Sequence, residues 1–284
     1  MKFNLDTAEL FVPDDLPVNQ ALMRTTHVCI AAHQDDIEIM APQPILECYQ
    51  SSDRWFTGVV VTDGRGSPRD GLYASYSDEE MRLVRLKEQR KAAFVGEYAA
   101  LVMLGYPSQE VKDSRNRTII ADIAEVILAT RPEVVFTHNL ADKHATHVGV
   151  AVKVIEAIRS LPVSAHPDYL YGCEVWRGLD WLMDDEKVVF DCSVQSNLQV
   201  SLIGIFDSQV SGGKRYDLAT MGRRVANATY YASHNVDDAS GMTFSMDLTP
   251  LIRNPDSSLQ DYVAERIDRF AQDVSGLITS VSQK

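Results

Sequence analysis

Short runs of apolar residues, each bounded by polar residues, recur through the first 160 residues. They are rich in residues that favour strands, and they carry no polar alternation, which is typical of strands buried on both faces of a parallel sheet. The runs that predict strands are 28–32, 55–62, 99–104 and 133–137.

Helical patterns separate these runs. Ser77 and Glu80 form a capping box, which predicts a helix from there to about Val95. Residues 118–130 carry one apolar face and precede Arg131-Pro132, and residues 148–158 repeat apolar positions at helical spacing. This alternation predicts an α/β fold with a Rossmann-like, doubly wound, mostly parallel sheet flanked by helices.

The pattern becomes less regular after Pro162. It predicts two strands and three further helices, at 169–176, 187–191, 197–207, 218–232 and 259–281. Because no break in composition divides the chain, we expect one domain over 1–284, with a core at 25–160. Residues 161–284 are then expected to supply a substrate-shaping cap and closing helices.

Charge and cysteine usage narrow the classes of partner. A formal net charge of -13 over 284 residues disfavours binding to nucleic acid or to an anionic membrane. The cysteines form no C-x-x-C pair and are expected to be buried free thiols; they are Cys29, Cys48, Cys173 and Cys192. The N-terminus lacks the pattern of a signal peptide and no apolar run approaches about 18 residues, so a cytoplasmic location is expected.

Candidate chemistry begins directly after the first buried run, at His33-Gln34-Asp35-Asp36. Ligands of open α/β sheets bind outside the carboxyl ends of the strands, so these side chains should face the crevice. An imidazole from His33 and a carboxylate from Asp36 are both ordinary zinc ligands.

A second cluster, His144-Ala145-Thr146-His147, follows the run at 133–137 and opens the next helix. His147 could complete a three-ligand set with His33 and Asp36, which would leave a fourth position open to water. Such a site lowers the pKa of its water to about 7. Asp35 could then accept the proton of the water, and His144 could stabilise the developing oxyanion or protonate the leaving group.

The remaining histidines are weaker candidates. His166, in Ala165-His166-Pro167-Asp168, superficially copies a metal-binding turn, but no apolar strand leads into it and a loop is expected. His27 begins a strand and should pack against the core, whereas His138 lies near the clusters and could support a ligand from behind.

Together, Ala32-His33-Gln34-Asp35-Asp36-Ile37-Glu38 and His144-Ala145-Thr146-His147 resemble the paired motifs of the LmbE-like (PIG-L) N-deacetylase family. The resemblance covers roughly residues 27–160. It implies that His33, Asp36 and His147 bind zinc, that Asp35 is the general base and that His144 is the catalytic imidazole. It also implies that Arg85, in Arg85-Leu86-Lys87-Glu88, contacts the sugar substrate; a solvated helix pair with Glu88 is the alternative.

The chain departs from the family pattern at three positions. Gln34 replaces the usual proline, which should loosen the turn without removing any chemistry. Thr146 replaces the aspartate that normally neighbours the catalytic histidine, and Asp142 is a candidate substitute. Arg65 stands where many relatives carry an acidic residue, which puts a standard sugar pose in doubt.

The resemblance implies a zinc-dependent hydrolase that removes an N-acetyl group from a small-molecule amino sugar or its conjugate. One alternative is an amidase that cleaves a larger acyl group from a sugar or thiol conjugate, and another is a metal-dependent sugar-binding protein without catalysis. A phosphoesterase is disfavoured, because neither a second-metal carboxylate set nor a P-loop is visible. Fe2+ or another divalent ion could replace Zn2+ at such ligands, and a homo-oligomer is possible.

Overall fold

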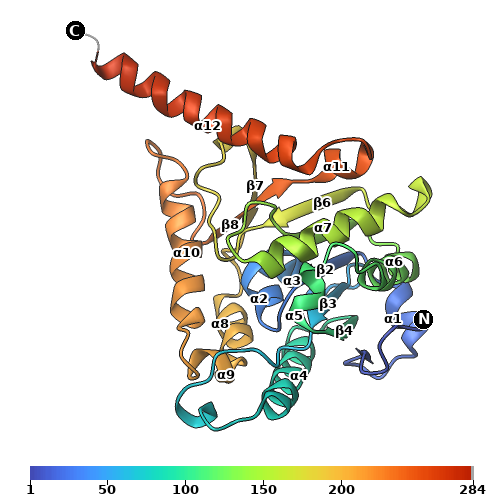
Figure 1. Cartoon of the computed structure of the whole chain (residues 1–284). Coiled ribbons are helices and arrows are strands. Elements are labelled where there is room, and N and C mark those ends of the chain that lie inside the picture. Colours follow the sequence, from blue (N-terminus) through green and yellow to red (C-terminus); the bar gives the residue numbers. More distant parts are fainter. Residues whose placement is uncertain (283–284) are drawn as a thin grey trace.

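The computed structural model describes residues 1–282 and contains one eight-stranded sheet (Figure 1). The strand order is β1-β4-β3-β2-β5-β6-β8-β7. The strands are β1 (Glu9–Phe11), β2 (His27–Ala31), β3 (Phe56–Thr62), β4 (Ala100–Tyr106), β5 (Val134–His138), β6 (Tyr169–Cys173), β7 (Lys187–Asp191) and β8 (Met242–Asp247).

The five central strands, β4-β3-β2-β5-β6, are all parallel. Antiparallel pairing is confined to the edges, where β1 pairs with β4 and where β8 pairs with both β6 and β7. The predicted fold class, a mostly parallel α/β sheet, is therefore confirmed. Strands from beyond residue 160 extend the same sheet.

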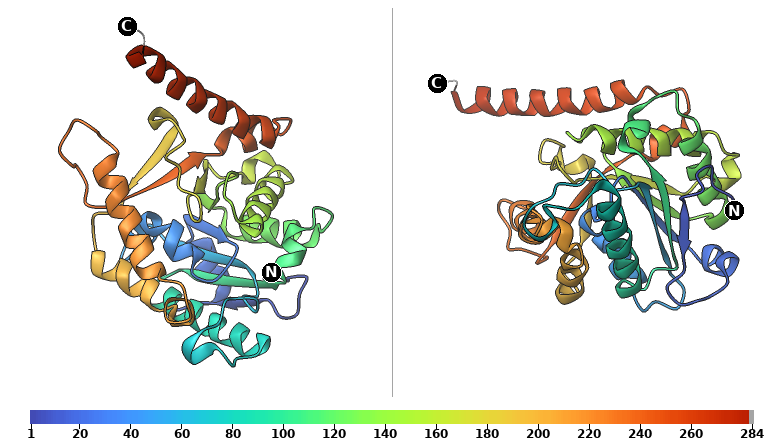
Figure 2. Two further views of the ribbon diagram at one scale, coloured as in Figure 1. Left: turned by 60° about the vertical axis from the view of Figure 1, so that its left-hand side comes forward. Right: turned by 60° about the horizontal axis from the view of Figure 1, so that its bottom comes forward.

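Helices cover both faces of the sheet, as the views in Figures 1 and 2 show. Their bounds are α1 (Val18–Met23), α2 (Asp36–Met40), α3 (Pro42–Cys48), α4 (Asp78–Val95), α5 (Ser108–Lys112), α6 (Thr118–Thr130), α7 (Ala145–Arg159), α8 (Ser196–Gly204), α9 (Asp207–Val210), α10 (Tyr216–Tyr230), α11 (Thr249–Arg253) and α12 (Leu259–Ser282). Three 3-10 turns lie at Gly71–Tyr73, Val163–Ala165 and Asp184–Glu186.

The buried side chains form two cores, one on each face of the sheet. In β2, Val28 and Ile30 join the core beneath α6 and α7, whereas Cys29 and Ala31 join the core beneath α2, α3, α4 and α8. This alternation is the reason that the run in β2 contains no polar position. All four cysteines are buried free thiols, as expected.

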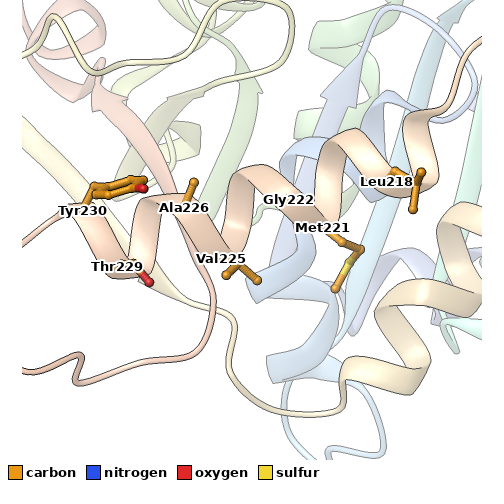
Figure 3. Close-up of a pocket in the computed structure, with 7 residues that line it drawn as sticks. All are labelled: Leu218, Met221, Gly222, Val225, Ala226, Thr229 and Tyr230. Atoms are coloured by element: carbon orange, nitrogen blue, oxygen red, sulfur yellow. The ribbon is translucent and has the colours of Figure 1, made fainter.

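Helices α10 and α12 each expose several apolar side chains to solvent. The outer face of α10 forms an exposed groove whose lining includes Leu218, Val225 and Tyr230 (Figure 3). The described part of α12 contains no buried residue, and its second half projects beyond the sheet and its helices (Figure 2). Among residues 1–282, no helix is both long enough and apolar enough to cross a membrane.

Candidate metal centre and active site

The two histidine clusters meet where the strand order reverses. The chain runs from β2 through β3 to β4 on one side of the sheet, and then returns to place β5 and β6 on the other side of β2. The carboxyl ends of β2 and β5 therefore flank a topological switch point, where open α/β sheets hold their ligands. His33 follows β2, His138 is the last residue of β5, and His144 and His147 lie in the segment that follows.

The three predicted metal ligands lie together. His33 Nδ1 is 3.1 Å from Asp36 Oδ2 and 3.2 Å from His147 Nε2, and the last two atoms are 3.3 Å apart. In a tetrahedral zinc site with bonds of about 2.0–2.1 Å, neighbouring ligand atoms are separated by about 3.3–3.4 Å. The triangle of donor atoms thus fits three corners of such a site, with a fourth corner left for water or substrate.

Charge interactions hold this triangle in place. Asp36 Oδ2 accepts a hydrogen bond from the His33 backbone N–H at 2.7 Å. Burial disfavours the charged forms of Asp36 and His147, but their mutual attraction outweighs it. The pKa of Asp36 is accordingly held well below its usual range, and the pKa of His147 is raised to about 9.

Asp142 supports His147 from behind. Its Oδ2 lies 3.4 Å from His147 Nδ1, and its Oδ1 accepts a hydrogen bond from the backbone N–H of His144. A carboxylate on the outer nitrogen of a ligating histidine orients the ring toward the metal. The carboxylate of Asp142 bonds to the His147 ring and to the His144 backbone. It does not bond to the His144 imidazole, so it does not replace the aspartate that is missing at Thr146.

His138 lies within the cluster, but its Nε2 already accepts a backbone hydrogen bond. Its ring stacks on His147 at 3.9 Å between centroids, and its Nε2 is 3.5 Å from Asp36 Oδ2. Asp36, His138 and His147 could by proximity form an alternative metal set. However, His138 Nε2 accepts a hydrogen bond from the Ala32 backbone N–H at 2.9 Å, which uses the lone pair that a metal would need.

Asp35 adjoins the ligands in a strained conformation, with φ +92°. Gln89 accepts a hydrogen bond from its backbone N–H, and Arg85 Nη2 lies 3.3 Å from its carboxylate. Burial raises the pKa of Asp35 to about 7, even though Arg85 favours the charged form. A carboxyl group tuned in this way can accept a proton near neutral pH.

His144 precedes α7 and is partly exposed on the cavity side of the cluster. Its ring lies 5.1 Å from that of His33, and its Nδ1 has no hydrogen-bond partner among the described residues. Burial and the neighbouring His147 lower its pKa to about 4, which favours the neutral imidazole. His33, His144 and His147 lie close enough together to form another possible metal set.

Arg85 is 1% exposed and Glu88 6%, so the alternative of a solvated helix pair is wrong. Glu88 accepts hydrogen bonds from the backbone and hydroxyl of Ser208, both at 2.7 Å. Arg85 lines the cavity and donates to the Gln34 carbonyl. Its Nη1 lies 3.8 Å from Glu88 Oε2, and neither Nη1 nor Nε has a hydrogen-bond partner among the described residues. Substrate contact by Arg85 stays a prediction.

Two of the departures have clear structural consequences. Gln34 does not loosen the turn, because its side chain is fully buried and donates to the Thr62 carbonyl at 3.0 Å. Gly64 faces it with φ +72°, and a Cβ there would lie only 2.3 Å from Gln34 Oε1. Arg65 bonds to Asp63 at 2.5 Å.

The cluster opens into a cavity of about 460 Å³. Its other walls come from the loop after β3, from α5, from the segment after β6 and from the α9–α10 segment. Residues there that the sequence did not single out include Ser67, Ser108, Lys112, Trp176, Gln209, Lys214 and Tyr216. His166 is not among the lining residues; its Nε2 lies 3.0 Å from the Leu161 carbonyl oxygen, in the expected loop.

Comparison with known proteins places this site in a family. Residues 28–158 match the family model described as PIG-L: GlcNAc-PI de-N-acetylase. No curated protein sequence matches the chain.

Solved structures with the same fold include N,N'-diacetylchitobiose deacetylase from Pyrococcus horikoshii, at 17% identity and a TM-score of 0.61, covering 81% of this chain and 86% of that one. Others are the 4-carboxy-2-hydroxymuconate hydratase GalB from Pseudomonas putida (15%, TM-score 0.58, covering 80% and 96%) and the A40926 pseudoaglycone deacetylase Dbv21 (15%, TM-score 0.57, covering 79% and 97%). Residues 28–158 of the chain are therefore a domain of the PIG-L, or LmbE-like, family.

Proposed function

We propose that the protein is a zinc-dependent hydrolase that removes an N-acetyl group from an amino sugar or an amino-sugar conjugate. The observation that carries the proposal is the triangle of His33, Asp36 and His147 donor atoms, with the Asp35 carboxyl beside it. The family match and the deacetylases among the structural neighbours agree with this reaction class.

His33, Asp36 and His147 would hold the ion, which when bound supplies a Lewis acid for the amide carbonyl and lowers the pKa of water to about 7. Asp35 accepts the proton of the attacking water. The water oxygen adds to the carbonyl carbon, and the proton that Asp35 took reaches the nitrogen as the C–N bond breaks. A free amine and acetic acid leave, and the acid ionises to acetate.

His144 is assigned to the carbonyl oxygen or to the leaving nitrogen. In its neutral form one ring nitrogen carries a hydrogen and can donate to the developing oxyanion. Alternatively, it relays to the leaving nitrogen the proton that Asp35 took from water, accepting it on one ring nitrogen and donating from the other, since an amide nitrogen must be protonated before it departs.

The fold alone does not select the reaction, because one neighbour is a hydratase and others are deacetylases. The test is acetate release, together with metal analysis, over N-acetylated amino sugars and their glycosides. We expect stoichiometric acetate and amine from the zinc-loaded protein and none after chelation. Activity confined to bulky amides would indicate the larger-acyl amidase, and metal binding without turnover of any amide would indicate a sugar-binding protein.

A further inference from the structure

The charge of the cavity is opposite to that of the whole chain. The chain carries 40 acidic and 27 basic residues. Among the described residues that line the cavity, the only carboxylates are those of Asp35 and Asp36, both of which belong to the reacting cluster, whereas Arg85, Lys112 and Lys214 line the same space. Outside the reacting cluster, every charged side chain that lines the cavity is therefore cationic.

The lysines near the cavity are not used to hold the fold together. Within residues 1–282, no carboxylate oxygen lies within 4.0 Å of the ammonium of Lys112, Lys143 or Lys214. Lys187, in contrast, pairs with Asp184 at 2.7 Å, and Lys153 donates to two backbone carbonyls. In a protein with an excess of carboxylates, lysines left free beside a site are available for a ligand.

Two of these lysines lie over the ring of Trp176. The Nζ of Lys214 lies 5.1 Å from its ring centroid and the Nζ of Lys143 lies 5.8 Å from it, both within the range of a cation–π contact. The ring is nearly parallel to that of His144, at 6.3 Å, and Tyr216 packs edge-on at 6.1 Å. An apolar ring beside the catalytic imidazole suits a sugar face, and the flanking ammonium groups suit a negative substituent.

Trp176 is fixed rather than mobile in this arrangement. Its backbone N–H donates to Asp142 Oδ2 at 3.1 Å, and the same oxygen lies beside His147 Nδ1. The aromatic wall formed by Trp176 and the proposed ligand His147 therefore share one carboxylate, that of Asp142.

We propose that the substrate of this site carries an anionic group, a phosphate or a carboxylate, which Lys112 and Lys214 bind. Lysine binds such groups as a point charge with three donors, without the fixed geometry that arginine imposes. The inference rests on the proposed function for the reaction, but it concerns a different part of the substrate.

The activity arm compares N-acetylglucosamine 1-phosphate with methyl N-acetylglucosaminide, using the zinc-loaded protein. We expect kcat/KM to be roughly tenfold or more higher for the anionic sugar, and to fall with rising salt for that sugar alone. Lys214→Met and Lys112→Met should each lower kcat/KM for the phosphate roughly tenfold, mainly through KM, and change the neutral sugar less than about twofold. Lys87→Met, an exposed lysine of α4 outside the cavity, is the matched control and should change neither.

The binding arm uses glucose 1-phosphate, glucuronate and methyl glucoside, which have no acetyl group, in isothermal titration calorimetry. The first two probes separate phosphate from carboxylate, and direct coordination to the metal would not respond to the lysine variants. Binding of either anion that both lysine variants weaken would support the inference even if no acetyl group is released, in which case only the proposed reaction fails. Equal handling of charged and neutral sugars, or losses shared by both in the lysine variants, would overturn it.

Discussion

At the scale of single residues, the local order of the first motif separates binding from proton transfer. Asp36 is one corner of the ligand triangle and accepts a hydrogen bond from the His33 backbone N–H. Asp35, the preceding residue, has φ +92°, and its carboxylate lies beside Arg85 instead. Two adjacent carboxylates thus have opposite environments, and burial pushes the pKa of Asp35 up while His147 holds that of Asp36 down. Such divergence is expected for a ligand beside a base.

Asp35→Asn tests this separation. An amide has nearly the shape of the carboxyl group but cannot accept the proton of the water, so we expect turnover to fall by a factor of about 10² to 10⁴. Zinc content should stay near the wild-type level, because Asp35 is not a ligand in this account. The measurement is acetate release with metal analysis on the same samples, and Asp238→Asn, at an exposed position, is the control. Undiminished turnover would remove Asp35 from its assigned role.

At the scale of helices and strands, much of the architecture could be predicted because the signals were local. The capping box of α4 is present, with Glu80 accepting from the Ser77 backbone at 2.8 Å, and α6 occupies the predicted residues. β2 and β3 begin and end within one residue of the expected bounds. The positions of His33, just after β2, and of His147, in the first turn of α7, could be inferred for the same reason.

Other elements depend on contacts between segments that are distant in the chain, so local patterns did not predict them correctly. In β8, the polar residues Thr243 and Ser245 alternate with the apolar residues Phe244 and Met246, but both sets are buried by partners distant in the chain. The expected helix over 197–207 is divided into α8 and α9. Helix α2 spans only five residues; Arg224 of α10 donates to the carbonyls of Glu38 and Ile39 at its end, a tertiary contact that no local pattern contains.

The cavity walls were also beyond local inference. Trp176 lay at the end of an expected strand, and Lys112 belongs to α5, which has only five residues and was not predicted. Lys214 lies in the segment between α9 and α10, where the pattern had already become irregular. Their meeting depends on the packing of distant segments at one edge of the sheet.

Helix α12 carries an apolar stripe that its own chain covers only at the beginning, where Val263 packs against the core. Apolar residues recur at alternating spacings of four and three, which is a heptad pattern, at Val263, Ile267, Phe270, Val274, Leu277 and Val281. Ile267, Val274 and Val281 occupy one heptad position, and Val263, Phe270 and Leu277 occupy the other; the β-branched residues of the first position favour two-stranded pairing. Beyond Phe270 every described residue is exposed.

We therefore expect α12 to pair with α12 of a second copy of the chain. Val274→Asp combined with Leu277→Asp should convert a dimer into a monomer, because charges within an apolar seam are costly to bury. Gln272→Asp, on the opposite side of the helix, should leave the dimer intact. Light scattering coupled to size-exclusion chromatography measures the mass; a wild-type monomer, or a dimer that survives the double substitution, would refute this pairing.

At the scale of the whole molecule, the fold gathers its candidate chemistry at the carboxyl ends of the central strands β2 and β5. The sheet reverses its strand order between β2 and β5, and the ligand triangle, the base, the aromatic wall and the lysines all gather at that point. The chain thereby surrounds a cationic cavity with a surface of opposite net charge. The proposed selectivity for a charged substrate and the proposed position of the metal both depend on this topology.

The most direct test of the central claim is anomalous diffraction at the zinc edge from crystals of the zinc-loaded protein. The account predicts one peak at about 2.0–2.2 Å from His33 Nδ1, Asp36 Oδ2 and His147 Nε2, with a fourth position held by water or another small ligand. Neither His138 nor His144 should coordinate the ion. A peak bonded to His138 or His144 in place of Asp36, or no peak among these residues, would contradict the account.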